Sequence, residues 1–204
     1  AQYRACVLDG YCTDAWEMGS VSRDNYYLDV DFDDYPVIYV THEQAEQYCT
    51  WAGKRLPTEA EWEKAARGMD ERTYPWGFSR PDCTMANFSK IVSERTDQGD
   101  ILFSEDCSGD TVRVDQFSAY RSPYGIYNMA GNVAEWVADW YAADYYDAEL
   151  YPDNDENPLG PAEGTQRVIR GGSFSENQYF IRTSARSRAA PESRMPYVGF
   201  RCAK

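Results

Sequence analysis

The sequence predicts a loop-rich domain in which two main helices combine with short strands. Two capping boxes mark the helices, frequent turn motifs separate the extended segments, and long apolar runs are few. The composition agrees, because 17 Tyr, 6 Trp and 14 Gly accompany a mean hydropathy of -0.69. No linker or charge block divides the chain, so residues 1–204 are expected to form a single domain.

Both helices are predicted from a threonine that is followed three residues later by a side chain able to bond back to the backbone. The first helix is expected over Thr41–Ala52, where Gln44 completes the capping box. The second is expected over Thr58–Gly68, where Glu61 completes the box and a glycine ends the helix.

The remaining elements are short. Residues 1–12 form a brief segment between Cys6 and Cys12, and an acidic loop follows at Asp29–Asp34. Alternating carboxylates in that loop suit a hard cation, but a solvated turn is favoured because nothing in the sequence fixes the loop's geometry. Short strands are expected at Pro36–Val40, Val112–Phe117, Arg167–Arg170 and Gly199–Cys202.

The charge of the chain restricts its partners. A net charge of -14 and a sequence pI near 4.4 argue against nucleic acid, because proteins that bind phosphate backbones concentrate Lys and Arg on one face. Cations are the better-matched partners, although many acidic proteins carry such charge only as a solvated surface. No segment approaches the roughly 18 apolar residues of a membrane span, so no membrane insertion is expected.

The cysteines indicate disulfides rather than a metal centre. There are 6 Cys, none in a C-x-x-C pair, and the single histidine is His42, which leaves too few ligands for a Cys/His zinc site. Disulfides persist in oxidising compartments, so the protein is expected to be secreted, periplasmic or displayed on the cell surface.

Five motifs occur in a fixed order along the chain. They are Gly53–Glu63 (GKRLPTEAEWE), Tyr74–Gly77 (YPWG), Asn128–Trp136 (NMAGNVAEW), Arg170–Phe174 (RGGSF) and Gly199–Ala203 (GFRCA). Together they resemble the formylglycine-generating enzyme, or sulfatase-modifying factor, family. The resemblance implies a loop-rich α+β fold related to the C-type lectin fold, with short antiparallel strands. It covers roughly residues 36–204, and the domain is expected to lack the family's N-terminal strands.

The resemblance also implies a disulfide. In the family, the cysteine in the helix before the first motif is bonded to the cysteine of the last motif, which corresponds here to Cys49 with Cys202. By proximity, Cys6 would then pair with Cys12, and Cys83 with Cys107.

The third motif holds the candidate calcium ligands. From the residues alone, a hard-cation loop and a capped turn whose glutamate bonds to the backbone are equally good interpretations. The resemblance favours calcium, because family members bind it through positions matching Asn128, Gly131, Val133 and Glu135. A second family calcium site corresponds to Asn87, Phe88, Asp106 and Ser108, although the loop between its two halves differs here.

The family's catalytic chemistry depends on residues that this chain lacks. Its enzymes oxidise a substrate cysteine with a copper(I)-binding cysteine pair, and aligning Ala185-Arg186 with the family's Ala-Arg segment places Gln178 and Thr183 at those two positions. A sister branch uses iron held by three histidines, which one histidine cannot supply. No copper, iron or zinc is therefore expected, and His42 and Ser173 are interpreted as structural residues.

A basic series in the last quarter of the chain is the candidate ligand groove. Arginines interleaved with aromatic residues suit an anionic or sugar-acid ligand, but pairing with the many internal carboxylates is the favoured interpretation. The proposed groove residues are Phe174, Gln178, Tyr179, Arg182, Arg186, Arg188 and Tyr197.

Three hypotheses for function follow. The first is a non-catalytic, calcium-stabilised binding or structural module of a secreted or cell-surface protein, taking an unidentified protein, peptide or glycan ligand, within a larger protein or assembly. The second is an enzyme of the same fold, either a formylglycine-generating-like oxidoreductase or one with other chemistry in the same groove. The third is a hypervariable ligand-displaying protein.

Overall fold

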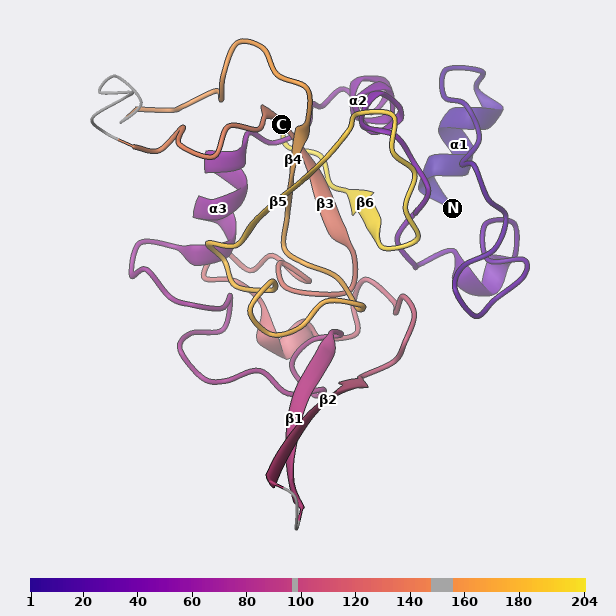
Figure 1. Cartoon of the computed structure of the whole chain (residues 1–204). Helices are drawn as coiled ribbons and strands as arrows, with labels where there is room; N and C mark the ends of the chain where they lie inside the picture. Colours follow the sequence, from indigo (N-terminus) through magenta and orange to yellow (C-terminus); the bar gives the residue numbers. More distant parts are fainter. Residues whose placement is uncertain (97–98, 148–155) are drawn as a thin grey trace.

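The structure is a computed structural model that describes residues 1–96, 99–147 and 156–204 (Figure 1). Its α-helices are α1 (Gln2–Leu8), α2 (His42–Trp51) and α3 (Glu59–Arg67), with 3-10 turns η1 (Val30–Phe32) and η2 (Ser118–Tyr120). Its strands are β1 (Ser89–Thr96), β2 (Gly99–Asp106), β3 (Ala134–Trp140), β4 (Arg167–Arg170), β5 (Arg186–Ala189) and β6 (Val198–Phe200). None of the described helices is both long enough and apolar enough to cross a membrane.

The two predicted main helices are confirmed with their caps. The Thr41 hydroxyl accepts a bond of 3.1 Å from the Gln44 amide, while the Gln44 side chain accepts one of 2.9 Å from the Thr41 amide. Thr58 and Glu61 form the same reciprocal pair at the start of α3. Each box satisfies backbone donors that a helix start leaves unpaired, so the local sequence alone sets where these helices begin.

A four-stranded sheet in the order β5-β4-β3-β6 forms the centre of the molecule, and a separate β1-β2 hairpin projects from it (Figure 1). β4 has the predicted bounds, and β6 begins one residue before the predicted strand and ends at Phe200. β3 pairs antiparallel with β4 and parallel with β6.

The sheet lies between the two main helices, and successive side chains of its strands pack against one helix and then the other. Trp136 and Ile169 pack with Ala45 and Cys49 on the α2 side. Val137 follows Trp136 on β3, and Val168 precedes Ile169 on β4. Both valines pack with Trp62 and Ala66 on the α3 side. Successive side chains of a strand point to opposite faces, so two short strands supply both halves of the core.

Two predicted strands are wrong. Residues 36–40 are irregular, since Tyr39 has a left-handed φ of 58° and its amide donates to the Met195 carbonyl rather than to a strand partner. Residues 112–117 also form no strand. There, the side chain of Asn132 bonds the Val112 amide at 2.8 Å and its carbonyl at 3.1 Å, taking the place of a neighbouring strand.

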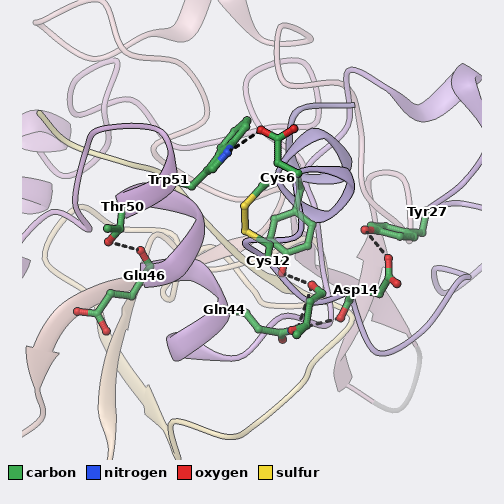
Figure 2. The surroundings of a disulfide bond; sticks show 11 residues. Cys6, Cys12, Asp14, Tyr27, Gln44, Glu46, Thr50 and Trp51 are labelled. Atoms are coloured by element: carbon green, nitrogen blue, oxygen red, sulfur yellow. Dashed lines mark hydrogen bonds between the residues drawn. A yellow bond between two sulfur atoms is a disulfide. The ribbon is translucent and has the colours of Figure 1, made fainter.

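The N-terminal segment contains a helix that the sequence did not predict, α1. It packs on α2, where the Trp51 indole donates to the Asp9 carboxylate at 3.0 Å (Figure 2). The Gln44 amide reaches the Asp14 carbonyl at 2.8 Å, so one side chain both caps α2 and binds the loop after α1. These contacts order a helix too short to be stable alone.

The three expected disulfides are present, and no cysteine is free. Cys6 pairs with Cys12 beside the contacts between α1 and α2 (Figure 2), Cys49 with Cys202, and Cys83 with Cys107. The second bridge spans 153 residues and fastens the C-terminal segment to α2.

Candidate functional site

Residues 128–133 of the third sequence motif form a tight loop before β3, and Glu135 is the second residue of that strand. Asn128, Gly131 and Asn132 all have positive φ, at 50°, 75° and 65°. A Cβ at Gly131 would lie 2.3 Å from the Asn87 carbonyl oxygen, so only glycine fits there. Asparagine and glycine tolerate left-handed backbone better than other residues, which explains why this sequence makes this loop.

Glu135, the only carboxylate among the first set of expected ligands, is buried and has several partners. Its carboxylate accepts bonds of 2.6 Å from both Nε and Nη2 of Arg201. The Trp62 indole donates to Oε2 at 2.7 Å. Partners from α3 and from the segment after β6 therefore hold this carboxylate in one orientation.

The Asn128 side chain has one bonded end and one unpaired end. Its Nδ2 donates to the Val114 carbonyl at 2.6 Å, whereas its Oδ1 is buried without a hydrogen-bond partner. An unpaired buried amide oxygen is costly unless a donor or a cation meets it. Asn128, Gly131, Val133 and Glu135 all line one cleft of about 460 Å³, so the residues present fit a hard cation.

The second set of expected ligands is only partly brought together. Asn87 is buried, with Oδ1 accepting from the Ser108 hydroxyl at 2.7 Å and Nδ2 donating to the Asp110 carbonyl at 2.8 Å. Phe88 is buried beside it, and its carbonyl accepts from the Cys107 amide at 3.0 Å. Asp106 is exposed at the end of β2.

The buried carboxylate beside Asn87 is Asp110, which the sequence reasoning missed. It accepts bonds from the hydroxyls of Ser20 at 2.5 Å and Ser22 at 2.7 Å. Burial opposes its ionisation, but these bonds and two backbone amides outweigh that effect, so the pKa of Asp110 lies below its ordinary value. Asp110 fastens the N-terminal segment to this loop, and no local pattern distinguishes it from the exposed aspartates.

The two candidate metal segments touch each other. The Asn132 amide donates to the Asn87 carbonyl at 2.8 Å, and the Gly131 amide donates to the Gly171 carbonyl at 2.9 Å. The Asn132 carbonyl in turn accepts from the Phe174 amide at 2.9 Å. Backbone hydrogen bonds of the loop therefore join the third motif to the fourth and to Asn87. Among the described residues, no three His, Cys, Asp or Glu side chains gather into a metal-binding group.

Gln178 and Thr183, which are predicted to take the positions of the family's cysteine pair, are buried and hydrogen-bonded. The Gln178 Oε1 accepts from the Ile91 amide at 3.1 Å, and its carbonyl accepts from the Tyr74 hydroxyl. The Thr183 hydroxyl donates to the Arg72 carbonyl at 2.7 Å. Both side chains therefore hold neighbouring backbone in place.

The proposed groove residues occupy different surroundings. Phe174 and Gln178 are buried, and Tyr197 packs against the core. Tyr179 is 54% exposed, with the Arg182 guanidinium 4.8 Å from its ring centroid. Arg186 forms a fork onto Glu59, and Arg188 lies over the Tyr141 ring. Arg182 thus lies beside the exposed Tyr179, and Phe180, the next residue along the chain, is 49% exposed.

The arginine series is mostly engaged within the molecule. Arg186 and Arg201 pair with buried carboxylates, as the favoured interpretation of the sequence has it. Arg182, Arg188 and Arg194 instead lie over aromatic rings, those of Tyr179, Tyr141 and Trp16 respectively. Such contacts hold the cation while leaving part of it open to a ligand.

His42 and Ser173 have structural surroundings. The His42 Nε2 donates to the Val137 carbonyl at 2.9 Å, and its ring meets the Trp136 ring edge-on. Burial, with help from the Arg167 charge, lowers the pKa of His42 to about 4. Ser173 is buried, and its hydroxyl bonds to the Ser175 hydroxyl and to the Glu176 carboxylate.

A buried charged cluster was also missed by the sequence reasoning. Glu59 at the start of α3 lies against Arg170 and Arg186, and its amide donates to Asp139 at 2.7 Å. Burial raises the pKa of Asp139 to about 6, and its Oδ1 has no partner. Glu63 and Arg186 also line a cavity of about 630 Å³. Local motifs contain Glu59 and Arg170, but nothing in them shows that these residues meet.

These features define a loop-rich α+β domain, with a mixed sheet between two capped helices and a loop suited to a hard cation. The chain belongs to the sulfatase-modifying factor family, since the model of the sulfatase-modifying factor enzyme 1-like domain matches residues 1–204.

Curated relatives support this assignment. The formylglycine-generating enzyme of Thermomonospora curvata is 41% identical over 182 residues, which is 85% of this chain and 56% of that protein. The enzyme of Mus musculus is 40% identical over 176 residues, 83% of this chain and 44% of that protein. Inactive C-alpha-formylglycine-generating enzyme 2 of Bos taurus is 33% identical over 176 residues, 83% and 50% respectively. The chain thus spans about half the length of these relatives.

Solved structures share the fold. Treponema denticola variable protein 1 has a TM-score of 0.68 at 21% identity, covering 98% of this chain and 80% of that one, and shows the fold alone. PvdO from Pseudomonas aeruginosa has a TM-score of 0.62 at 27% identity, covering 82% and 60%.

Proposed function

We propose that this domain is a non-catalytic, calcium-stabilised binding module of the sulfatase-modifying factor family. The proposal rests on which residues occupy the two positions that match the family's cysteine pair. Gln178 and Thr183 fill them with buried side chains bonded to the backbone, and every cysteine of the chain is in a disulfide. No thiolate is left to bind copper(I) or to exchange with a substrate cysteine.

The calcium part of the proposal rests on the loop before β3. The unpaired Oδ1 of Asn128 and the buried carboxylate of Glu135 are the side-chain oxygens that would hold the ion. Carbonyls of Gly131 and Val133, which line the same cleft, would complete the set. Calcium here would act as a crosslink between loops and would supply no redox chemistry.

A second ion is proposed at Asn87, Phe88, Asp106 and Ser108. Asn87 and Ser108 are already in contact, but Asp106 is exposed and would have to turn inward. Metal analysis distinguishes one bound ion from two.

The proposed ligand surface is Tyr179, Phe180 and Arg182. The two rings are 54% and 49% exposed and consecutive in the chain, so together they present apolar surface that a partner could cover. A guanidinium beside open rings suits a protein, peptide or glycan ligand that offers both apolar faces and acceptors. Three disulfides favour a secreted, periplasmic or surface protein, and the domain would act within a larger protein or assembly.

The first test combines thermal unfolding with metal analysis. Calcium should raise the unfolding midpoint of the chelator-treated protein, because a ligand at about 100 times its Kd stabilises by about 2.7 kcal/mol. Asn128→Ala should remove most of that gain, while Asn25→Ala, on an exposed turn, should keep it. Equal midpoints with calcium and with chelator would refute the calcium part.

The second test addresses catalysis. Copper(I)-treated protein and a cysteine-containing sulfatase-type peptide should give no aldehyde product by mass spectrometry, with an active family enzyme as the positive control. Turnover that depends on this protein would refute the non-catalytic part.

The third test addresses the ligand surface. Glycan and peptide arrays would be probed with the wild type, a Tyr179→Ala/Phe180→Ala variant and a Tyr11→Ala control. Tyr11 is 51% exposed in the N-terminal segment, so it matches the loss of an open ring. Binding lost only in the first variant supports the surface, and binding unchanged in both places the ligand elsewhere.

A further inference from the structure

The positively charged side chain of Arg201 contacts the candidate calcium site directly. Besides its two 2.6 Å bonds to Glu135, its Nη2 donates to the carbonyls of Tyr127 at 3.1 Å and Asn128 at 3.2 Å. One guanidinium thus connects the Glu135 carboxylate on β3 with two backbone oxygens at the start of the loop.

The carboxylate of Glu135 has little bonding capacity left. A carboxylate offers about four lone-pair positions, two on each oxygen. On Oε2, Arg201 and the Trp62 indole use both, and on Oε1, Arg201 uses one. An ion binding Glu135 would have to take the remaining position on Oε1, next to the Nη2 that is bonded to the same atom.

We infer that Arg201 is an internal counter-cation that competes with calcium for Glu135 and thereby weakens calcium binding. This inference rests on the calcium site of the proposed function and concerns its regulation. Two positive charges on one buried carboxylate repel each other, so the ion must displace the guanidinium or bind against its charge. Without the ion, Arg201 spares Glu135 the cost of a buried, unpaired charge.

Two effects of removing Arg201 follow from this competition. Without metal, Arg201→Gln leaves Glu135 without its cation and destabilises the fold. With calcium bound, the ion replaces the lost charge, so the variant recovers. A variant that is weakened more in its free state than in its bound state must bind calcium more tightly, by thermodynamic linkage.

The experiment is a calorimetric titration of the chelator-treated full chain with calcium, at fixed pH and ionic strength. Wild type is compared with Arg201→Gln, Arg201→Lys and the control Arg55→Gln. Arg55 forms the same two-point fork, at 2.6 and 2.7 Å, onto Glu61 outside the loop. The Kd of Arg201→Gln should fall by about tenfold or more. Lysine carries a point charge and cannot bond both carboxylate oxygens as arginine does, so the Kd of Arg201→Lys should lie between those of wild type and Arg201→Gln. The Kd of Arg55→Gln should match that of wild type.

Thermal unfolding gives an independent readout. The midpoint of Arg201→Gln should lie below wild type in chelator and approach it as calcium is added. If Arg201→Gln does not fold without metal, Arg201→Lys carries the same comparison. Calcium binding in these variants that is equal to or weaker than wild type, or absent, overturns the inference.

Failure of the inference and failure of the proposed function give different results. Wild type that binds calcium no more weakly than Arg201→Gln retains the proposed site and refutes the role of Arg201. If wild type binds no calcium and Arg201→Gln does, the proposed calcium function is refuted. That result would support Arg201 as the cation that keeps the ion out.

Discussion

Arg186 on β5 grips Glu59 at the start of α3 across 127 residues of sequence, with Nε 2.7 Å from Oε1 and Nη2 2.9 Å from Oε2. The fully buried Arg170 lies 3.4 Å from the same carboxylate and 2.6 Å from that of Glu63. This charge network couples α3 to two strands of the sheet. Glu59 and Arg170 are buried, so removing the Glu59 carboxylate leaves a buried positive charge without part of its compensation.

Glu59→Gln should therefore cost about 3 to 5 kcal/mol of unfolding free energy, since Arg170 and Arg186 lose a buried counter-charge. Glu61→Gln is the control, because its pair with Arg55 is exposed and should be worth about 1 kcal/mol or less. Urea denaturation at neutral pH measures both. Similar small losses in the two variants would show that the network contributes no more than a surface pair.

The pH dependence of stability should reveal Asp139. Burial raises its pKa from 3.8 to about 6, so the folded chain keeps a proton that the unfolded chain releases. Its stabilising effect is full below the unfolded pKa and is lost as the pH rises through about 6, a change of up to about 3 kcal/mol. Glu59, Arg186 and Arg167 are the charges that act on it. Asp139→Asn should remove this loss in unfolding measured across the interval.

His42 should act in the opposite direction. Its pKa is lowered from 6.5 to about 4, so its contribution is full above 6.5 and is lost as the pH falls through about 4. Over the shared interval the two effects offset each other in the wild type. Stability should thus rise with pH in Asp139→Asn and fall with pH in His42→Gln, by thermal unfolding at several pH values. Parallel profiles for both variants would contradict these assignments.

Thr183→Val should destabilise the domain by about 1 to 3 kcal/mol, because it removes the buried hydroxyl that donates to the Arg72 carbonyl while keeping the side-chain volume. Thr50→Val is a matched control, since its hydroxyl donates to the Glu46 carbonyl on an exposed helix face at 2.9 Å (Figure 2). Chemical denaturation compares them. Equal effects would mean that the Thr183 hydroxyl has no structural role beyond that of an exposed helix hydroxyl.

Replacing Cys49 and Cys202 together by alanine should cost about 5 kcal/mol, because their bridge constrains 153 residues of the unfolded chain. Replacing Cys6 and Cys12, only 6 residues apart, should cost about 2 kcal/mol in the same chain-entropy model. Thermal unfolding without reductant gives the comparison, and the reverse order would show that native contacts of α1 outweigh loop length.

The sequence by itself determined the elements whose causes are local. Thr41 with Gln44 and Thr58 with Glu61 form their capping boxes from residues three positions apart, so the starts of α2 and α3 are readable in the chain. The tight loop at Asn128–Asn132 likewise depends on local residues, because asparagine and glycine accept left-handed backbone. The family motifs added the disulfide between Cys49 and Cys202.

Only the tertiary structure decided what depends on distant partners. Residues 112–117 have the sequence pattern of a strand, but the Asn132 side chain bonds the Val112 amide and carbonyl in place of a neighbouring strand. Asp110 and Asp139 resemble other aspartates until folding buries them, and Arg201 meets Glu135 only because β6 aligns beside β3. Burial and charge pairing are properties of the assembled chain, and a sequence pattern records its own neighbours but not the side chains that folding brings to it.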